Sequence, residues 1–129
     1  MNIGEIAKRA GLPTKTVRYY ADVGLVKPSG RTEAGYRVYD DKTLRKLIFV
    51  RRSRAMGFSV GECRKLLSLY EDHSRASSEV RSIAKQHLVK IDAKLDELQK
   101  LQKELSMLVS CCHGDDRPDC PILDALGRG

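Results

Sequence analysis

Three cysteines and a histidine near the carboxyl-terminal end of the sequence are spaced so that they could bind a soft metal ion. Cys111, Cys112 and His113 are consecutive, and seven residues separate Cys112 from Cys120. Thiolates are soft ligands that prefer Cu(I) and its heavier congeners, whereas structural zinc normally takes four ligands. Because the side chains of adjacent cysteines point in different directions, two-coordinate binding by Cys112 and Cys120 is the easier geometry. The spacing favours a metal site, with a Cys112–Cys120 disulfide as the alternative.

The segment between these cysteines has the composition of a loop. Gly114 and Pro118 break a helix, and Asp115, Asp116 and Asp119 are hard oxygen donors that suit turns and caps better than a soft metal. The sequence therefore predicts a short loop that brings two thiols together.

The rest of the composition excludes membrane proteins and secreted disulfide scaffolds. The chain has 129 residues, 41% hydrophobic and 32% charged, which suits one compact domain or a small domain with an extended element. Its longest purely apolar run, Leu47–Val50, is far below the roughly 20 residues that cross a bilayer. The first residues have no apolar stretch typical of a secretory signal. We therefore expect a cytoplasmic protein with reduced thiols and no membrane partner.

The net charge of +7 is concentrated in the amino-terminal part of the chain. Residues 1–72 hold 15 Lys and Arg against 8 Asp and Glu. A basic segment of this kind is typical of a protein that binds a polyanion, although a solvated basic surface without a partner is also compatible with it.

Two short helices separated by a glycine predict a helix-turn-helix in this basic segment. The apolar spacing favours a helix over 4–10 that Gly11 ends, and a second helix over 15–23 capped by Thr14. The inner face of the second helix is expected to hold Val17, with Tyr20 or Ala21. Its outer face could enter a major groove of DNA. The residues that we expect to contact DNA from this helix are Lys15, Thr16, Arg18 and Tyr19.

Residues 25–39 predict a hairpin that could act as a wing. Short β-prone pieces flank a turn rich in Gly and Pro. Arg31, Tyr36 and Arg37 could contact the sugar-phosphate backbone. Of Tyr36 and Tyr39, we expect one to face the interior and one to face solvent.

Two further helices complete the predicted amino-terminal domain. The first begins after Asp40 or Asp41, ends near Met56, and carries Arg51, Arg52 and Arg54 as further candidate phosphate contacts. Its expected inner face consists of Leu44, Leu47, Ile48, Arg51 and Ala55. The second begins with a capping box, Ser59 with Glu62. Its expected inner face consists of Cys63, Leu66, Leu67 and Tyr70, which makes Cys63 a core thiol.

Residues 77–110 contain no Gly or Pro and predict one long helix. Apolar residues recur every three or four positions, which is the pattern of a coiled coil, and the stripe needs a partner such as the same helix of a second subunit. The predicted fold is mainly α: a winged helix-turn-helix domain (1–72), a dimerisation helix (73–110), and a metal-binding loop and tail (111–129).

Several motifs resemble the MerR family of transcriptional regulators. They are the segments 3–7, 18–20, 24–25 and 35–39. The tail from Cys112 to Ile122 is similar to the copper-efflux (CueR or HmrR) branch of that family. The resemblance implies a homodimer with an antiparallel coiled coil. It also implies that the dimer binds a promoter whose two elements are separated by an overlong spacer. When the dimer binds metal, it would bend and untwist this DNA so that RNA polymerase can use the promoter.

The resemblance also implies roles for individual residues. Cys112 and Cys120 would be the Cu(I) thiolates. Ser77 stands where relatives that sense divalent metals carry a cysteine, so a third thiolate is missing, which favours Cu(I) with Ag(I) or Au(I) as mimics. Two thiolates and one monovalent cation carry a net charge of −1, which is costly to bury. Arg81, one helical turn after Ser77, could compensate that charge.

Three alternatives remain open from the sequence. The protein could sense a divalent metal or the thiol redox state, with Cys111 as an additional ligand. It could be an architectural DNA-binding protein with a purely structural tail. The third, a thiol enzyme, is disfavoured because His113 beside Cys112 does not form a Cys–His–acid constellation, and we expect no catalytic residues.

Overall fold

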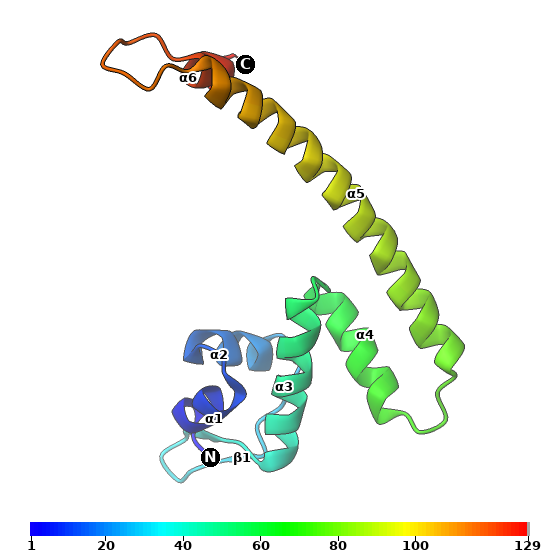
Figure 1. Ribbon diagram of the computed structural model, residues 1–129. Helices are drawn as coiled ribbons and strands as arrows, with labels where there is room; N and C mark the ends of the chain where they lie inside the picture. The colour runs from blue at the N-terminus through cyan, green and yellow to red at the C-terminus, as the bar shows by residue number, and fades with distance from the viewer. Residues whose placement is uncertain (129) are drawn as a thin grey trace. The chain divides into compact units, whose positions relative to one another are not determined.

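The computed structural model describes residues 1–128 and confirms a mainly helical chain (Figure 1). The chain divides into two compact units, one from Met1 to Val80 and one that begins at Arg81. Within residues 1–128, no helix combines the length and the apolar character needed to span a membrane.

The first two helices form the predicted helix-turn-helix. Helix α1 (Ile3–Ala10) is capped by the Asn2 side chain, which accepts a hydrogen bond from the backbone N–H of Glu5. Gly11 follows with φ 72°, a left-handed conformation that glycine adopts without strain. Helix α2 (Thr14–Asp22) begins one residue earlier than expected, so the prediction that Thr14 caps it is wrong. Pro13 holds the cap position, and its fixed φ of −62° suits a helix start without a side-chain bond.

The inner face of α2 is the one expected from its spacing. Val17 and Tyr20 are buried, and so are Leu25 and Val26 just beyond the helix. They join Ile6, Ala7 and Ala10 of α1 in the core of the first unit. The side chains of Lys15, Arg18 and Tyr19 are thereby left on the exposed face.

The predicted hairpin is present but short. Strands β1 (Gly30–Arg31) and β2 (Arg37–Val38) pair antiparallel, with Arg31 opposite Arg37. Tyr39 is buried at 2% exposure, whereas Tyr36 is 73% exposed. This confirms that one tyrosine faces the interior and the other faces solvent.

Helix α3 (Asp41–Ala55) begins after an Asp40 cap whose carboxylate accepts from the Thr43 N–H at 2.9 Å. Its buried residues are Thr43, Leu47, Val50 and Ser53. The expected inner face was correct for Leu47 but wrong for Ala55, which is exposed, and Leu44, Ile48 and Arg51 are only half-buried. The buried row is rotated because α1 packs against α3 on one side and α4 on another.

Helix α4 (Val60–Glu71) starts with the capping box that Ser59 and Glu62 predict, and both reciprocal hydrogen bonds are present. Cys63 is fully buried, as expected for a core thiol. The placement of Tyr70 on the inner face was wrong. Leu69 is buried in its place, and Tyr70 is 61% exposed with its ring against Phe49 at a centroid distance of 4.9 Å.

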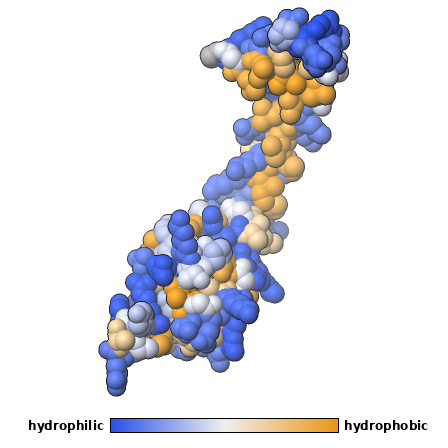
Figure 2. Space-filling model, turned by 90° about the vertical axis from the view of Figure 1, so that its left-hand side faces the viewer, coloured by the Kyte–Doolittle hydropathy of each residue, from blue (hydrophilic) through white to orange (hydrophobic). Residues whose placement is uncertain are grey.

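Helix α5 (Ser77–Cys111) is the predicted long helix, one residue longer at its carboxyl end. Apolar side chains follow one another along the helix surface in Figure 2. Helix α6 (Pro121–Gly127) was not expected from the sequence; Pro121 stands at its first position, where proline's missing N–H costs nothing.

Candidate DNA-reading face and thiol site

The outer face of α2 presents basic and aromatic side chains to solvent. Lys15 and Arg18 are exposed, Tyr19 is 51% exposed and Thr16 is half-buried. A shallow depression of about 330 Å³ adjoins this face and is lined by Lys15, Thr16, Tyr19, Tyr20, Arg54 and Val60. Four of the residues expected to contact DNA thus lie together, with Arg54 contributed by α3. Such a face offers cations and hydrogen-bond donors to base edges and phosphates.

The wing carries the other three residues expected to contact DNA. The Arg31 guanidinium donates to the Gly35 carbonyl at 3.1 Å, which closes the hairpin turn. Arg37 reaches back to Asp22 at the end of α2 with an N–O distance of 2.9 Å. This hydrogen bond to the Asp22 carboxylate is the main cause of a raised pKa for Arg37. The wing is therefore tied by charge to the helix beside it.

Three arginines of α3 and α4 hold backbone carbonyls within this unit. Arg51 donates to the Ala10 carbonyl at 2.9 Å, and Arg54 donates to the Phe58 carbonyl at 2.8 Å. Arg64 donates to the carbonyls of Val23 and Gly24. Arg51 and Arg54, which the sequence suggested only as phosphate contacts, thus also form hydrogen bonds within the protein. The bonds of Arg51 and Arg64 span 40 residues or more, which no local pattern predicts.

All four cysteines are free thiols, in different environments. Cys63 is buried, and desolvation raises the pKa of its thiol, which disfavours the thiolate that a metal needs. Cys112 and Cys120 are half-buried, and Cys111 is exposed at the last residue of α5. Among the described residues, no three His, Cys, Asp or Glu side chains gather as a metal-binding group.

The segment between Cys112 and Cys120 is a turn that local contacts organise. The Cys112 N–H still bonds to the Leu108 carbonyl, so Cys112 directly follows the last turn of α5. Gly114 follows with φ 64°. The Asp115 carboxylate accepts from both the backbone N–H and the side chain of Arg117, the latter at 2.8 Å. The interpretation of Asp115 as a turn former is confirmed.

The two residues expected near the metal lie at the start of α5. Ser77 is the first residue of that helix, and both Ser77 and Arg81 are exposed. Their spacing of four residues puts them on one face of the helix. Ser77 belongs to the first compact unit and Arg81 to the second.

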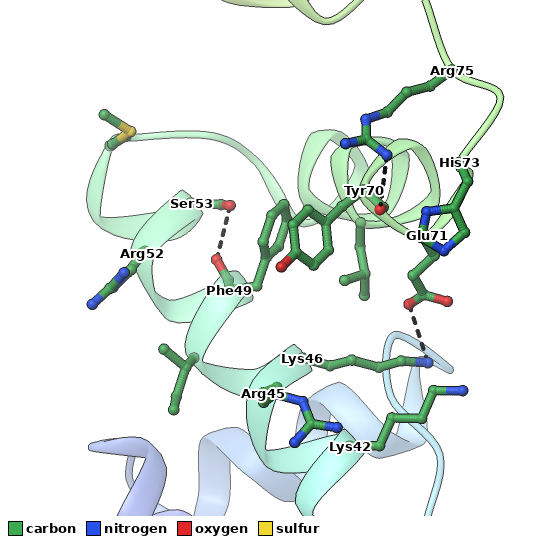
Figure 3. Close-up of a pocket in the computed structure, with 13 residues that line it drawn as sticks. Lys42, Arg45, Lys46, Phe49, Arg52, Ser53, Tyr70, Glu71, His73 and Arg75 are labelled. Atoms are coloured by element: carbon green, nitrogen blue, oxygen red, sulfur yellow. Dashed lines mark hydrogen bonds and ion pairs between the residues drawn. The ribbon is translucent and has the colours of Figure 1, made fainter.

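A groove of about 980 Å³ between α3 and α4 was not expected from the sequence (Figure 3). Apolar side chains, including Ile48, Phe49 and Leu67, form part of its lining, and cationic side chains surround them. The cationic residues are Lys42, Arg45, Lys46, Arg52 and Arg75. The signal that could have found the groove is the mixture of basic and apolar residues in 42–56.

Family comparisons agree with this architecture. Residues 1–69 match the MerR HTH family regulatory proteins, and residues 44–108 match the family described as MerR, DNA binding. The two matches together span both the helix-turn-helix and most of α5.

Individual relatives cover the whole chain. The HTH-type transcriptional regulator HmrR of Rhizobium leguminosarum bv. viciae is 56% identical over 129 residues, with 100% of this chain and 99% of the relative covered. CueR of Salmonella typhimurium is 40% identical over 126 residues, covering 98% and 91%. The crystal structure of PbrR691 from Ralstonia metallidurans CH34 in complex with lead(II) superposes with a TM-score of 0.77, at 35% identity and 98% coverage of both chains. The chain belongs to the MerR family of DNA-binding transcriptional regulators and is not an enzyme.

Proposed function

We propose that this regulator is a Cu(I)-responsive transcriptional activator that also accepts Ag(I) or Au(I). In this proposal the cytoplasmic protein binds promoter DNA as a homodimer and, when loaded with metal, distorts a promoter with an overlong spacer so that RNA polymerase can initiate. Genes of copper efflux and detoxification are the expected targets.

The observation that carries the proposal is the pair of thiols at the two ends of the 112–120 turn. Cys112 and Cys120 are both half-buried and free, so each is available for a soft ion and partly shielded from water. Soft thiolates select Cu(I), whereas zinc in proteins takes four ligands. The proposal thus rests on a donor set that is too small for a closed zinc site.

The residues that we assign to the site favour a monovalent ion. Ser77 supplies a hydroxyl where a third thiolate would favour a divalent cation. The bound pair of thiolates would keep a net charge of −1. In an antiparallel dimer, which places the start of one α5 beside the end of the other, the guanidinium of Arg81 is the group that we assign to compensate it.

The DNA-reading role is assigned to α2 and the wing. Lys15, Thr16, Arg18 and Tyr19 would face the major groove from α2, with Arg54 beside them. Arg31, Tyr36 and Arg37 would follow the backbone from the hairpin. The positive charge of residues 1–72 would add affinity that does not depend on sequence.

The homodimer is inferred from the apolar stripe of α5. Leu95, Leu98, Leu101 and Leu105 are each more than half exposed, and a helix of 35 residues is about 50 Å long. An exposed apolar surface of this extent marks an interface. A second copy, packed antiparallel, would bury both stripes and present two DNA-reading heads to a pseudo-palindromic operator.

In this proposal, activation is a thermodynamic linkage between metal binding to the protein and the shape of the DNA that the protein holds. The metal shifts the protein only by binding one of its conformations more tightly than the other, and a change from mostly inactive to mostly active needs about 5 kcal/mol of such preference. DNA deformation costs on the order of 1–6 kcal/mol, so metal binding can supply energy of the required size. We assign the difference to ordering of the 112–120 turn.

The test is in vitro transcription from a long-spacer promoter with buffered Cu(I), Zn(II) or Cd(II). We expect Cu(I) alone to induce transcription. Cys112→Ser and Cys120→Ser should keep operator binding and abolish induction, while Cys111→Ser, the matched control one residue away, should keep both.

Two results would contradict the proposal. Tighter binding of zinc than of Cu(I), together with loss of response in Cys111→Ser, would establish a divalent or redox sensor that uses Cys111. Transcription that ignores copper in both the wild type and Cys112→Ser would leave an architectural DNA-binding protein.

A further inference from the structure

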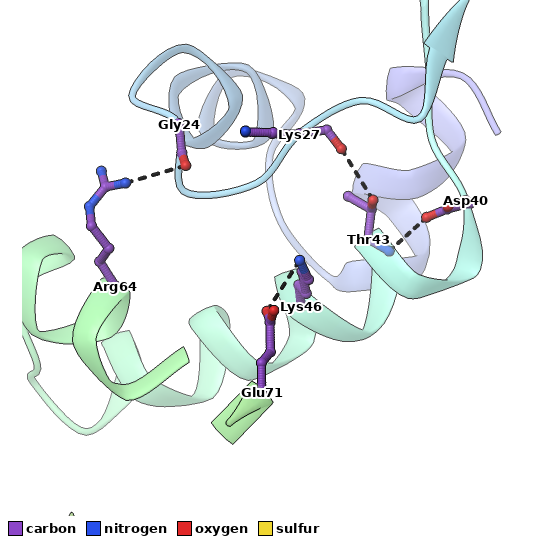
Figure 4. A network of polar contacts seen from close by, with 7 residues as sticks. All are labelled: Gly24, Lys27, Asp40, Thr43, Lys46, Arg64 and Glu71. Carbon is purple, nitrogen blue, oxygen red and sulfur yellow. Dashed lines mark hydrogen bonds and ion pairs between the residues drawn. The ribbon is translucent and has the colours of Figure 1, made fainter. Parts of the chain in front are cut away.

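Arg64 of α4 holds the carboxyl-terminal end of α2 through two backbone carbonyls. One terminal nitrogen of its guanidinium donates to the Val23 carbonyl at 2.7 Å, and the other donates to the Gly24 carbonyl at 3.3 Å. Figure 4 shows the side chain reaching from α4 to Gly24. The last carbonyls of a helix lack intrahelical partners and carry partial negative charge. A planar guanidinium with several donors can satisfy two of them at once.

The backbone at the end of α2 leaves these two carbonyls for Arg64. The Tyr19 carbonyl accepts from the N–H of Val23, and the Tyr20 carbonyl accepts from the N–H of Leu25 at 2.9 Å. Gly24 has φ 74°, and its backbone turns the chain away from the helix axis. The carbonyls of Val23 and Gly24 follow the end of α2, and both accept hydrogen bonds from Arg64.

Arg64 joins two helices that otherwise pack on different neighbours. Helix α2 packs mainly on α1, and α4 packs mainly on α3. The orientation of α2 relative to α4 therefore depends on few contacts. A side chain that fixes two atoms of one helix to the other constrains both distance and rotation between them.

The same turn of α4 is connected to the start of α5. Lys65, the residue after Arg64, forms an ion pair with Glu79 of the first turn of α5 at 3.1 Å. Lys46 of α3 pairs with Glu71 at the end of α4, also at 3.1 Å (Figure 4). Exposed ion pairs contribute little to stability, so these two contacts indicate only which segments lie beside α4.

We propose that Arg64 is a positioning residue for DNA recognition, which sets the orientation of α2 on α4 and thereby the fit of its outer face to the operator. The inference rests on the proposed DNA-reading role of α2. It assigns to Arg64 no contact with DNA, which separates it from the basic residues of α2 and the wing. The ion pair between Lys65 and Glu79 also connects this segment of α4 to the first turn of α5.

The experiment compares Arg64→Gln and Arg64→Lys with Arg75→Gln, all as full-length, metal-free protein. Arg75 is the matched control because its guanidinium also donates to two carbonyls, those of Tyr70 and Asp72 at the end of α4, but from the loop that directly follows that helix. Affinities are measured by fluorescence anisotropy for an operator duplex, selected from random sequence with the wild type, and for a scrambled duplex. Far-UV circular dichroism gives the folded fraction used to correct each affinity.

We expect Arg64→Gln to weaken operator binding about tenfold or more, the scale that the loss of a hydrogen bond from a charged group implies. Binding to the scrambled duplex should stay within about twofold of the Arg75→Gln value, and the salt dependence of operator binding should match that of the control. Arg64→Lys keeps the charge and can reach one carbonyl, so it should show a smaller loss.

Three results would overturn the proposal. The operator-to-scrambled ratio of Arg64→Gln could equal that of Arg75→Gln. The loss could vanish once the folded fraction is corrected, which would make Arg64 merely structural. The salt slope could fall by about one for both duplexes, which would make Arg64 a phosphate contact. The operator-to-scrambled ratio is measured on metal-free protein. If the wild type showed no copper response, the proposed function would be refuted, but this ratio would not change.

Discussion

The Arg37 guanidinium on strand β2 donates a hydrogen bond to the Asp22 carboxylate at the last residue of α2, with a donor–acceptor distance of 2.9 Å. The bond joins the wing to the helix that we assign to DNA reading. Asp22 also offsets a positive charge that would otherwise be free to meet phosphates. The pair therefore holds the wing in a defined position and, in exchange, weakens the attraction of Arg37 to polyanions in general.

Neutralising Asp22 should lower sequence discrimination. In Asp22→Asn, Arg37 loses its charged partner and the wing loses its anchor, so we expect binding to a scrambled duplex to strengthen by about two- to threefold while operator binding does not improve. Fluorescence anisotropy at two salt concentrations measures both affinities. Asp92→Asn makes the same charge change in the second compact unit, outside the residues that we assign to DNA reading, and should leave the ratio unaltered. An unchanged ratio in Asp22→Asn would refute the role of the pair.

Adding a thiol at Ser77 should change metal preference. In the proposed antiparallel dimer, the start of one α5 lies beside the end of the other, so Ser77→Cys supplies a third soft ligand there; we expect it to raise the affinity for Zn(II) and Cd(II) by about tenfold or more relative to Cu(I). Competition titrations with chromogenic chelators at neutral pH measure this. Ser82→Cys, on the exposed surface of the same helix, is the control. Equal metal preference in both variants would remove Ser77 from the site.

A charge in the apolar stripe of α5 should prevent dimerisation. Leu98 is 61% exposed, and in the proposed dimer a lysine there would be buried without a partner. We expect Leu98→Lys to sediment as a monomer at concentrations where the wild type is a dimer, and to lose affinity for a two-half-site operator. Ala93→Lys places the same charge on the opposite side of the helix and should remain dimeric. A dimeric Leu98→Lys would place the interface elsewhere.

The cap of α3 should make stability depend on pH in the acid range. Hydrogen bonds from the backbone and side chain of Thr43 hold the pKa of Asp40 below its usual value. A carboxyl whose pKa is lower in the folded state binds fewer protons there, so its contribution is complete above the unfolded pKa of about 3.9 and is lost as the pH falls through the folded pKa.

Asp40→Asn should keep a neutral cap and flatten this dependence. We expect the thermal midpoint of the wild type to fall more steeply than that of Asp40→Asn below about pH 4. Thermal unfolding followed by circular dichroism from pH 7 to pH 3 measures the difference. Asp41→Asn, the next residue, is the control and should follow the wild type. Parallel curves for the wild type and Asp40→Asn would contradict the assignment.

Local patterns were sufficient to predict most of the elements. The stop at Gly11, the Ser59–Glu62 capping box and the absence of Gly and Pro in 77–110 each act over a few residues, and each predicted an element that the structure contains. The cysteine spacing likewise predicted a turn between Cys112 and Cys120. Such features depend on propensity and capping within one segment, which is information that the sequence carries directly.

Other features depend on which surfaces meet, and only the tertiary structure decided them. The buried row of α3 lies at Thr43, Leu47 and Val50 because both α1 and α4 pack against α3, and no periodicity within α3 specifies these neighbours. Arg51 and Arg64 resemble any surface arginine until the carbonyls of α1 and α2 come within reach. The groove between α3 and α4 exists only once both helices are packed. Helix caps and turns depend on neighbouring residues, so the sequence predicts them directly. Contacts between residues 40 positions apart depend on how the helices of the first unit pack together.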